Sequence, residues 1–447
     1  MASALPGARF NAGLGVSAGL DATVGKRNLP SMPRRRYAWS LLVAMSFALG
    51  GCGDPSGPGT EVRWSQVAAG DFFTCALTTA GKAYCWGAAI FGQLGNDDVV
   101  PSATPIAVAG GHTFRALAVG SDHACGLDLG GAAWCWGLND YRELGLATAA
   151  CNDKFIFAAC ARLPMAVSGA HSFDSIVVAG YSSCALTANL TTFCWGWNVH
   201  GQVGSGPVGG VVNAPAQILS SRRFVALTLD ISHACGVMAS DSIFCWGSNI
   251  YGQLGADTLQ TPRCPLAGGT PFYCTVSPVY SGAGLVASRV SAGSTHTCAL
   301  NDVGDAWCWG SNEYGVLGNS TALGGRVPVP VLGGHAWSMI SSGADHTCAL
   351  DNGAAWCWGV NTYGQLGVAT VSEACHAFIS AQVCRTTPIA VASGVAFASI
   401  SAGSSHTCAL TSEGDIWCWG RGIEGQLGDG LSQTSSAPVR VATPGGA

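Results

Sequence analysis

The chain has 447 residues, of which 10% are charged and 48% hydrophobic, and 63 of them are glycine. From Cys52 onward there are 14 Lys or Arg residues against 24 Asp or Glu residues, a formal balance of −10 with no basic run, which excludes phosphate-driven binding of nucleic acid. No long segment repeats apolar residues with a 3.6-residue period, so the composition favours short strands and tight turns over helices.

The amino-terminal segment has the features of an export signal. Residues 34–36 are three arginines, and residues 37–51 form an uncharged stretch too short for a membrane span of about 20 residues. The Leu-Gly-Gly before Cys52 resembles the lipobox of bacterial lipoproteins, which implies that residues 1–51 are a signal peptide and that Cys52 is lipidated. An ordinary secretory signal and an uncleaved anchor are the alternative interpretations, and Met32 is an alternative start.

A short linker separates this signal from a repetitive region. Residues 52–61 are rich in Gly and Pro and are expected to form a flexible tether. Residues 62–442 are expected to form one domain of seven repeats, and residues 443–447 a tail.

Seven copies of a Cys-Trp-Gly motif define the repeat, with a mean spacing of 55.5 residues. Each copy has a strand ending in Ala-Gly or a similar pair, then His-x-Cys-Ala-Leu, a glycine turn, Cys-Trp-Gly, Tyr-Gly-Gln-Leu-Gly and a Pro-x-x-Val strand. Periods of this length predict propeller blades. The first glycine of the Gly-Gln-Leu-Gly segment is expected to form a tight turn that only a residue without Cβ fits. These glycines are Gly92, Gly201, Gly252, Gly315, Gly364 and Gly425.

The cysteines after Cys52 fall into ten local pairs, an arrangement typical of exported proteins. Seven pairs lie within the repeats, where facing strands of a hairpin bring Cα atoms to about 4.5–5.5 Å, within disulfide range. These pairs are Cys75–Cys85, Cys125–Cys135, Cys184–Cys194, Cys235–Cys245, Cys298–Cys308, Cys348–Cys357 and Cys408–Cys418. Three further pairs lie between repeats: Cys151–Cys160, Cys264–Cys274 and Cys375–Cys384. The adjacent tryptophans are expected to point to the opposite strand face and pack between blades.

Two sets of residues recur at fixed places in the repeat. Histidine precedes the first hairpin cysteine by two residues at positions 123, 233, 296, 346 and 406, with Phe73 and Ser182 at the same place. A metal-binding ring is one interpretation, and a buried histidine that bonds a backbone carbonyl in each blade is the favoured one. Before the Gly-Gln-Leu-Gly turn stand Phe91, Tyr141, His200, Tyr251, Tyr314, Tyr363 and Glu424, for which structural packing is expected.

The connections after repeats two, four and six are long, and each contains its own cysteine pair and large apolar residues. Such side chains in a polar loop either cover the propeller rim or bind a partner, preorganised by the disulfide. The candidates for partner binding are Phe155, Phe157, Phe272, Tyr273 and Phe378.

The repeat resembles a known family. The sequence AGSTHTCAL followed by GDAWCWGSNEYGVLG, with GQLG in repeats one, four, six and seven, is similar to the regulator of chromosome condensation repeat. The resemblance implies an all-β fold, a seven-bladed β-propeller. We expect a disulfide-bridged hairpin in each blade and ring closure by pairing of the N- and C-terminal strands, which would remove two open edges.

The functional prediction is a surface-tethered propeller that binds proteins. No catalytic residues, cofactor or metal are predicted, because no nucleophile, phosphate-loop or metal motif is present. The expected partner is an envelope or extracellular protein, and the expected form is a monomer held to a membrane of the cell envelope by its lipid anchor. The alternatives are an enzyme acting on polysaccharide or a lactone at the channel and, by family analogy, guanine-nucleotide exchange or light sensing.

Overall fold

The computed structural model describes residues 62–151, 158–256, 263–264, 271–370, 373–375 and 382–444, with the side chains of 373–375 and 382 left out. The predicted signal, Cys52, Phe155, Phe157 and Phe378 lie outside the described residues. Within the described ranges, no helix is long and apolar enough to cross a membrane.

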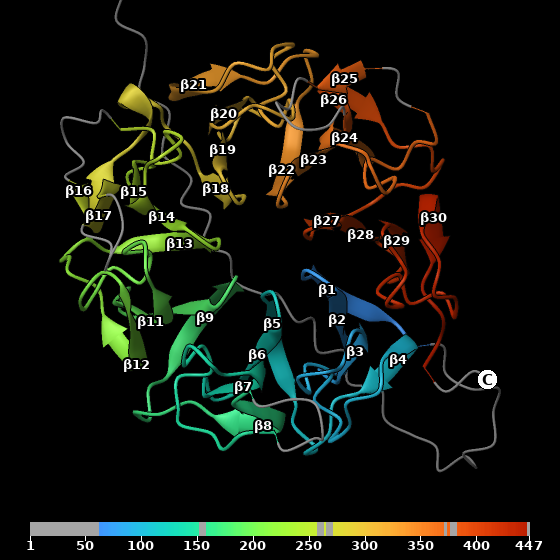
Figure 1. The fold of residues 1–447 in the computed structure, drawn as a ribbon. Coiled ribbons are helices and arrows are strands. Elements are labelled where there is room, and N and C mark those ends of the chain that lie inside the picture. Colours follow the sequence, from blue (N-terminus) through green and yellow to red (C-terminus); the bar gives the residue numbers. More distant parts are fainter. Residues whose placement is uncertain are drawn as a thin grey trace, which may run out of the picture. The chain divides into compact units, whose positions relative to one another are not determined.

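The described chain is built of seven antiparallel sheets, the blades of a propeller (Figure 1), and this confirms the predicted fold class. Blade 1 contains β1 (Trp64–Ala69), β2 (Phe73–Thr78), β3 (Ala83–Gly87) and β4 (Ser102–Ala107). Blade 2 contains β5 (Phe114–Val119), β6 (His123–Asp128), β7 (Ala133–Leu138) and β8 (Cys160–Ala166). Blade 3 contains β9 (Phe173–Ala179), β10 (Ser182–Thr187), β11 (Thr192–Asn198) and β12 (Gly210–Gln217).

The remaining blades follow the same plan, with additional strands in two of them. Blade 4 contains β13 (Phe224–Leu229), β14 (His233–Met238), β15 (Ile243–Ser248), β17 (Phe272–Tyr280) and β16 (Arg263–Cys264), followed by the short helix η2 (Gly282–Gly284). Blade 5 contains β18 (Arg289–Ala292), β19 (His296–Leu300), β20 (Ala306–Gly310) and β21 (Gly325–Pro330). Blade 6 contains β22 (Trp337–Ser342), β23 (His346–Asp351), β24 (Ala354–Val360), β26 (Gln382–Ala390) and β25 (Glu373–Cys375). Blade 7 contains β27 (Ser399–Ala402), β28 (His406–Leu410), β29 (Ile416–Gly420) and β30 (Ser435–Arg440).

The hairpin between the second and third strands of each blade carries the disulfide. All seven predicted hairpin bridges are present, with Cα atoms 4.0–4.1 Å apart, closer than the expected range. The paired cysteines lie directly opposite each other, for example Cys298 and Cys308, in the close spacing of a non-hydrogen-bonded antiparallel pair. In the connections, Cys151–Cys160 and Cys264–Cys274 are bridged as well. Because the side chain of Cys375 lies outside the described part, its bridge to Cys384 stays a prediction.

The hydrophobic core lies between blades as much as within them. The seven Cys-Trp-Gly tryptophans are completely buried, as the alternation of side chains along a strand predicts. Trp136 of blade 2, for example, packs in one cluster with Phe73 and Leu94 of blade 1. Each blade thus needs its neighbour to bury its largest side chain, which makes the stability of the blades interdependent.

The ring does not close by pairing of the terminal strands, so this expectation was wrong. Strands β1 and β30 belong to different sheets, because each blade is made of consecutive strands. Blade 1 instead packs against blade 7 through β1, β27 and β28. The Trp64 amide donates to Gly414 O at 3.0 Å, as Phe114 does to Gly81 O between blades 1 and 2. The closing interface therefore repeats the contact made between other neighbouring blades.

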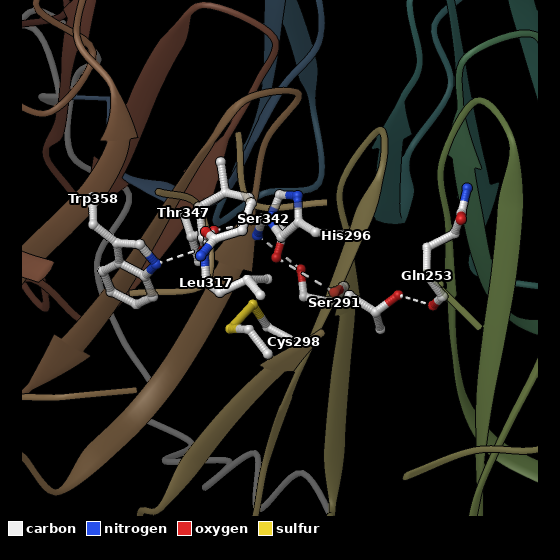
Figure 2. The surroundings of a disulfide bond; sticks show 12 residues. Gln253, Ser291, His296, Cys298, Leu317, Ser342, Thr347 and Trp358 are labelled. Atoms are coloured by element: carbon white, nitrogen blue, oxygen red, sulfur yellow. Dashed lines mark hydrogen bonds between the residues drawn. A yellow bond between two sulfur atoms is a disulfide. The ribbon is translucent and has the colours of Figure 1, made fainter. Parts of the chain in front are cut away.

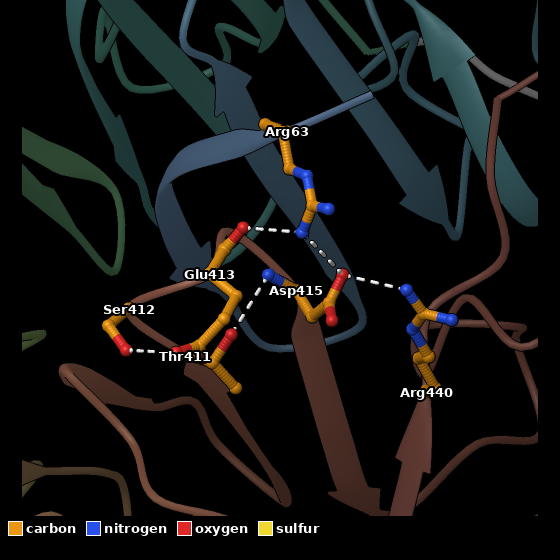
Figure 3. Close-up of polar contacts among 6 residues, drawn as sticks. All are labelled: Arg63, Thr411, Ser412, Glu413, Asp415 and Arg440. Atoms are coloured by element: carbon orange, nitrogen blue, oxygen red, sulfur yellow. Dashed lines mark hydrogen bonds and ion pairs between the residues drawn. The ribbon is translucent and has the colours of Figure 1, made fainter. Parts of the chain in front are cut away.

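Charged side chains add to this closing interface (Figure 3). Arg63, just before β1, donates to the carbonyl of Glu413 at 2.6 Å and lies 3.8 Å from the carboxylate of Asp415. The same carboxylate accepts a hydrogen bond from Arg440 of β30 at 2.8 Å. Asp415 thus links the segment preceding β1 to the last strand of the ring.

Candidate functional site

A hydrogen-bonded relay joins neighbouring blades at five boundaries of the ring, and Figure 2 shows the one between blades 5 and 6. At the boundary of blades 5 and 6, His296 Nε2 lies 2.9 Å from Thr347 Oγ1, and this hydroxyl donates to Val316 O at 3.2 Å. The indole of Trp358 donates to the same carbonyl at 2.7 Å. The four other histidine–hydroxyl pairs are His123 with Ser183, His233 with Thr297, His346 with Thr407 and His406 with Thr74.

The relay fixes the state of the histidines. Since the hydroxyl proton goes to the carbonyl, histidine Nε2 is the donor to the hydroxyl, and Nδ1 carries no proton. Burial lowers the pKa of four of these histidines to about 3 and that of His406 to about 4, so all five are neutral at physiological pH. The expected partner, a carbonyl within the same blade, was wrong, because the next blade presents a hydroxyl at this point. No group of metal ligands occurs within the described residues.

Two boundaries lack the relay, and each lacks both members of the pair. Phe73 replaces histidine in blade 1, and the hydroxyl position of blade 2 is then Ala124, which packs in the same core cluster. Ser182 replaces histidine in blade 3, and the corresponding position of blade 4 is Ala234. The sequence contained this signal: histidine is present only when the following repeat offers Ser or Thr.

Carboxyl groups and aromatic rings lie together on one face of the propeller, which we call the loop face. It consists of the turns that join the first strand to the second and those that follow the third strand. These turns are adjacent, as the Leu138 amide donating to Asp122 O at 2.9 Å shows. The three cysteine-tied connections dock there through one equivalent bond in each blade. The bonds run from Asn139 N to Ala159 O, from Asn249 N to Tyr273 O and from Asn361 N to Val383 O, at 2.7–2.8 Å.

Five carboxyl groups on the loop face have raised pKa values. Asp71, Asp122, Asp230 and Asp345 lie in the first turns of blades 1, 2, 4 and 6, and Glu143 lies in the second turn of blade 2. Burial is the main cause, and it raises the pKa of Asp122 to about 6, of Asp230 to about 7 and of Glu143 to about 8. Among the ion pairs of the described ranges, none includes any of the five.

The acidic turns border the central cavity. A cavity of about 410 Å³ is lined by the innermost strands and first turns of all seven blades. Its walls are mostly small residues, and Asp71 and Asp230 supply its carboxyl groups. A hydrogen bond from Ser121 opposes the effect of burial on the pKa of Asp71 without overcoming it. Sequence reasoning missed this cluster, because the aspartates stand three to five residues before the first hairpin cysteine and four of the seven repeats contribute one.

The aromatic positions before the Gly-Gln-Leu-Gly turn are more exposed than expected. Tyr141 and Tyr363 are each 37% exposed and Tyr251 is 49% exposed, so packing accounts for only part of this set. Tyr141 forms a triad with Tyr181 and Trp197 of blade 3, with ring centroids 5.2, 5.7 and 6.0 Å apart. These rings give the loop face an apolar, half-buried surface beside its carboxyl groups.

Two of the predicted partner-binding residues are described. Phe272 is half-buried and lies edge-on against the His200 ring at 5.2 Å, which places it beside the aromatic triad. Tyr273 lies beneath the guanidinium of Arg263 at 5.2 Å, so β16 and β17 hold it in place. Both belong to the loop face, and their role in binding stays a prediction.

Comparisons with known proteins agree with the fold. A family model described as the regulator of chromosome condensation (RCC1) repeat matches residues 80–127, 240–300, 303–350, 352–410 and 413–447. A second model of this repeat matches residues 64–93, 114–143, 287–316 and 397–426.

Two plant proteins are among the similar sequences. The ultraviolet-B receptor UVR8 of Arabidopsis thaliana is 27% identical over 261 residues, 58% of this chain and 55% of that protein. The mitochondrial RCC1 domain-containing protein RUG3 of the same plant is 28% identical over 281 residues, 61% of this chain and 59% of that protein. The matched region thus spans little more than half of each relative.

Two solved structures are similar over most of the chain. Human WBSCR16 has a TM-score of 0.67 at 21% identity, covering 81% of this chain and 94% of that one. Yeast RCC1 (Prp20), solved bound to Kap60, has a TM-score of 0.67 at 19% identity, covering 90% and 91%. At these identities the likeness establishes the fold only. Because a family model covers more than half of its residues, and its described residues form seven blades, the chain belongs to the regulator of chromosome condensation (RCC1) repeat family.

Proposed function

We propose that this protein is an exported, lipid-anchored propeller that binds another protein of the cell envelope through its loop face. One observation carries the proposal: the three connections that contain their own cysteine pair dock on the same face as the exposed rim tyrosines and the five carboxyl groups that form no described ion pair. A rigid surface with aromatic side chains is suited to protein recognition, because little conformational entropy is lost on binding.

The fold supports protein binding, and the cysteines support export and attachment to a membrane. Yeast RCC1 (Prp20), which shares the fold, was solved in complex with the protein Kap60, so propellers of this type bind proteins. The disulfides favour an oxidising compartment. The lipobox-like sequence before Cys52 favours attachment to a membrane by acyl chains.

An enzymatic role is the alternative, and the carboxyl groups with raised pKa values favour it. Asp122 and Glu143 have pKa values in the range that general acids use. The substrate class would be an envelope polysaccharide, since glycoside hydrolysis uses two carboxyl groups. Turnover of any envelope glycan by the purified protein, lost in Glu143→Gln, would establish this alternative.

The binding proposal is tested by removing the predicted anchors. We expect replacement of Phe155, Phe157, Phe272, Tyr273 and Phe378 by serine to abolish capture of the envelope partner and to leave the thermal midpoint nearly unchanged, because binding anchors contribute little to the fold that presents them. The control variant replaces Leu129 and Val303 by serine. Both residues are exposed and lie in the turn between the second and third strands, at the end of the blade away from the loop face. A large fall in the midpoint of the five-residue variant would show that these side chains cover the rim instead.

A further inference from the structure

We propose that the loop face contains a recognition site for a basic side chain, an arginine or lysine presented by a protein partner, formed by Asp122, Glu143, Tyr141, Tyr181 and Trp197. We call these five residues the acidic–aromatic site. The inference rests on the proposed protein-binding function and specifies the chemistry of the partner.

Glu143 differs from the residue that most other repeats have at the same place. Five other repeats have glutamine at this place: Gln93, Gln202, Gln253, Gln365 and Gln426. In Gln202, Oε1 accepts the backbone amide of His200, and Nε2 donates to Ile231 O in the next blade. Glu143 keeps the first bond, from Tyr141 N to Oε2 at 2.8 Å. Its Oε1 is buried and has no hydrogen-bond partner.

This orphaned oxygen changes the chemistry of the position. Where Gln93 and Gln202 donate to the next blade, the ionised carboxylate of Glu143 presents a second acceptor. A buried acceptor without a partner costs free energy, and a donor from outside the chain would remove that cost. A positively charged donor is favoured over a neutral one because the charge would also stabilise the carboxylate.

The surroundings of Glu143 add negative charge. Asp140 and Asp122 raise the pKa of Glu143 further, and burial together with Asp122, Asp71 and Glu143 raises the pKa of Tyr181. Arg142 lies next to Glu143 in the chain, yet it forms no ion pair with these acids among the described contacts, and its Nη1 is itself buried without a partner. Among the described ion pairs, these acids therefore have no cationic partner within the chain.

The rings supply the second half of the recognition chemistry. Tyr141, Tyr181 and Trp197 pack against one another, and each keeps part of its ring in contact with solvent. A guanidinium or ammonium group is attracted to the face of an aromatic ring, most strongly to tryptophan. Carboxylates and aromatic faces side by side favour arginine, which both stacks and forms paired hydrogen bonds.

At another boundary the protein places its own arginine between a tyrosine ring and a carboxylate. Arg421 stands directly after the Cys-Trp-Gly motif of blade 7, the place that Trp197 has in blade 3. Its guanidinium lies 5.3 Å from the ring centroids of both Tyr363 and Phe72, and it forms two hydrogen bonds with Glu424, at 2.6 and 3.1 Å. Tyr363 has the same place in its repeat as Tyr141.

The two boundaries differ in whether the chain itself supplies a cation. Between blades 6 and 7, an arginine from the chain fills the position between a tyrosine ring and a carboxylate. Between blades 2 and 3, Trp197 stands in the place of the arginine and His200 in the place of Glu424, and the carboxyl group comes instead from Glu143, two residues after Tyr141. A partner's arginine or lysine would bring to this boundary the cation that Arg421 supplies to the other.

The test uses a defined probe and the purified full chain. The probe is a fluorescent, end-blocked Gly-Arg-Gly-Arg-Gly peptide, and its matched control carries citrulline, which has the shape of arginine without the charge. We expect the arginine peptide to bind at least about tenfold more tightly than the citrulline peptide, and added salt to weaken it. Equal affinity for the two peptides would overturn the proposal.

Two variants locate the binding on the protein. Glu143→Gln restores the residue of the other repeats, and Trp197→Arg places a cation where Arg421 stands in blade 7. Both should lower the affinity for the arginine peptide toward that of the citrulline peptide, by about tenfold. Glu313→Gln, an exposed acid on the loop face of blade 5, is the matched control and should leave the affinity unchanged.

The outcomes separate this proposal from the broader one. Unchanged affinity in both Glu143→Gln and Trp197→Arg would reject the acidic–aromatic site, even if an envelope protein is captured through the loop face. Charge-selective peptide binding without any captured envelope protein would support the site and count against the broader function.

Discussion

At the scale of single residues, Glu143 lowers the stability of the folded state when it is ionised, and it also has the proposed binding role. Burial and two neighbouring carboxyl groups raise its pKa to about 8 from an ordinary value near 4.5. The folded state therefore holds this proton more tightly than the unfolded state does. The contribution of Glu143 to stability is present at low pH and is lost as the pH rises from about 4.5 to about 8.

Replacement of this residue by glutamine gives a prediction with a defined sign. Glu143→Gln should unfold with a free energy at least about 1 kcal/mol higher than the parent at about pH 8.5, and with an equal one at about pH 4. Chemical denaturation at the two pH values measures the difference. Since the same variant should lose peptide affinity, a gain in stability would exclude misfolding as the cause. Equal stability at both pH values would show that the carboxyl group is not destabilised by its site.

The histidine relay gives a second prediction at this scale. His296→Phe and Thr347→Ala should each lower the free energy of unfolding by about 1–3 kcal/mol, because each leaves a buried polar partner unsatisfied. Together they copy the Phe73 and Ala124 pair of blades 1 and 2. The double variant should therefore lose less than the two single losses combined, which a double-mutant cycle measures. Additive losses would mean that the two side chains act independently.

Sequence reasoning predicted the histidines well and the acids not at all. It identified the five histidines as buried and structural because Phe73 and Ser182 replace them. It missed their partners, since a hydroxyl in the next blade becomes adjacent only when blades pack. Glu143 stood in the sequence as a departure from the glutamine of five other repeats, but its significance depends on Asp122, which the turns of blade 2 bring near, and on Tyr181, which belongs to the next blade.

At the scale of elements, the hairpin is the best predicted part of the molecule. Its register follows from the cysteine spacing and the glycine turn, and both act within about ten residues of sequence. The positive φ of Gly92, Gly201 and their counterparts, between 72° and 88°, agrees with the expected tight turns. Arg142 takes this place in repeat two with a φ of 63°.

Loss of one hairpin disulfide should weaken the whole domain. Replacing Cys298 and Cys308 by alanine should lower the free energy of unfolding by about 2–3 kcal/mol, because a loop of this length gains that much conformational freedom in the unfolded state. Denaturant titration measures the change. Non-reducing peptide mapping of the parent should find cysteines linked only within a hairpin or a connection, and links between different hairpins would contradict the register described.

Prediction of the closing element failed for a physical reason. Pairing of the terminal strands was expected because it removes open edges, yet β1 and β30 complete their own blades. The edge problem is managed differently, since β1 packs against blade 7 and Asp415 joins Arg63 to Arg440. Side-by-side packing of blades leaves no pattern in the sequence that distinguishes the closing boundary from the others.

At the scale of the whole molecule, the proposal needs the propeller to be held at a membrane. Cys52→Ser should move the protein from the membrane fraction to a soluble extracytoplasmic fraction, because acyl chains bind bilayers by burying methylenes, at about 0.8 kcal/mol each. Fractionation with a carbonate wash measures this. Retention of the variant in washed membranes would show that Cys52 is not the anchor.

The central claim is that the loop face binds an envelope protein, and photocrosslinking in intact cells tests it most directly. A photoreactive phenylalanine analogue is placed at Phe157, at Tyr251 or at Val303. Tyr251 is 49% exposed on the loop face, and Val303 is 76% exposed in the hairpin turn at the other end of blade 5. We expect Tyr251 and Phe157 to capture the same envelope protein and Val303 to capture none of it. Capture from Val303 alone, or equally from all three positions, would contradict the proposed binding face.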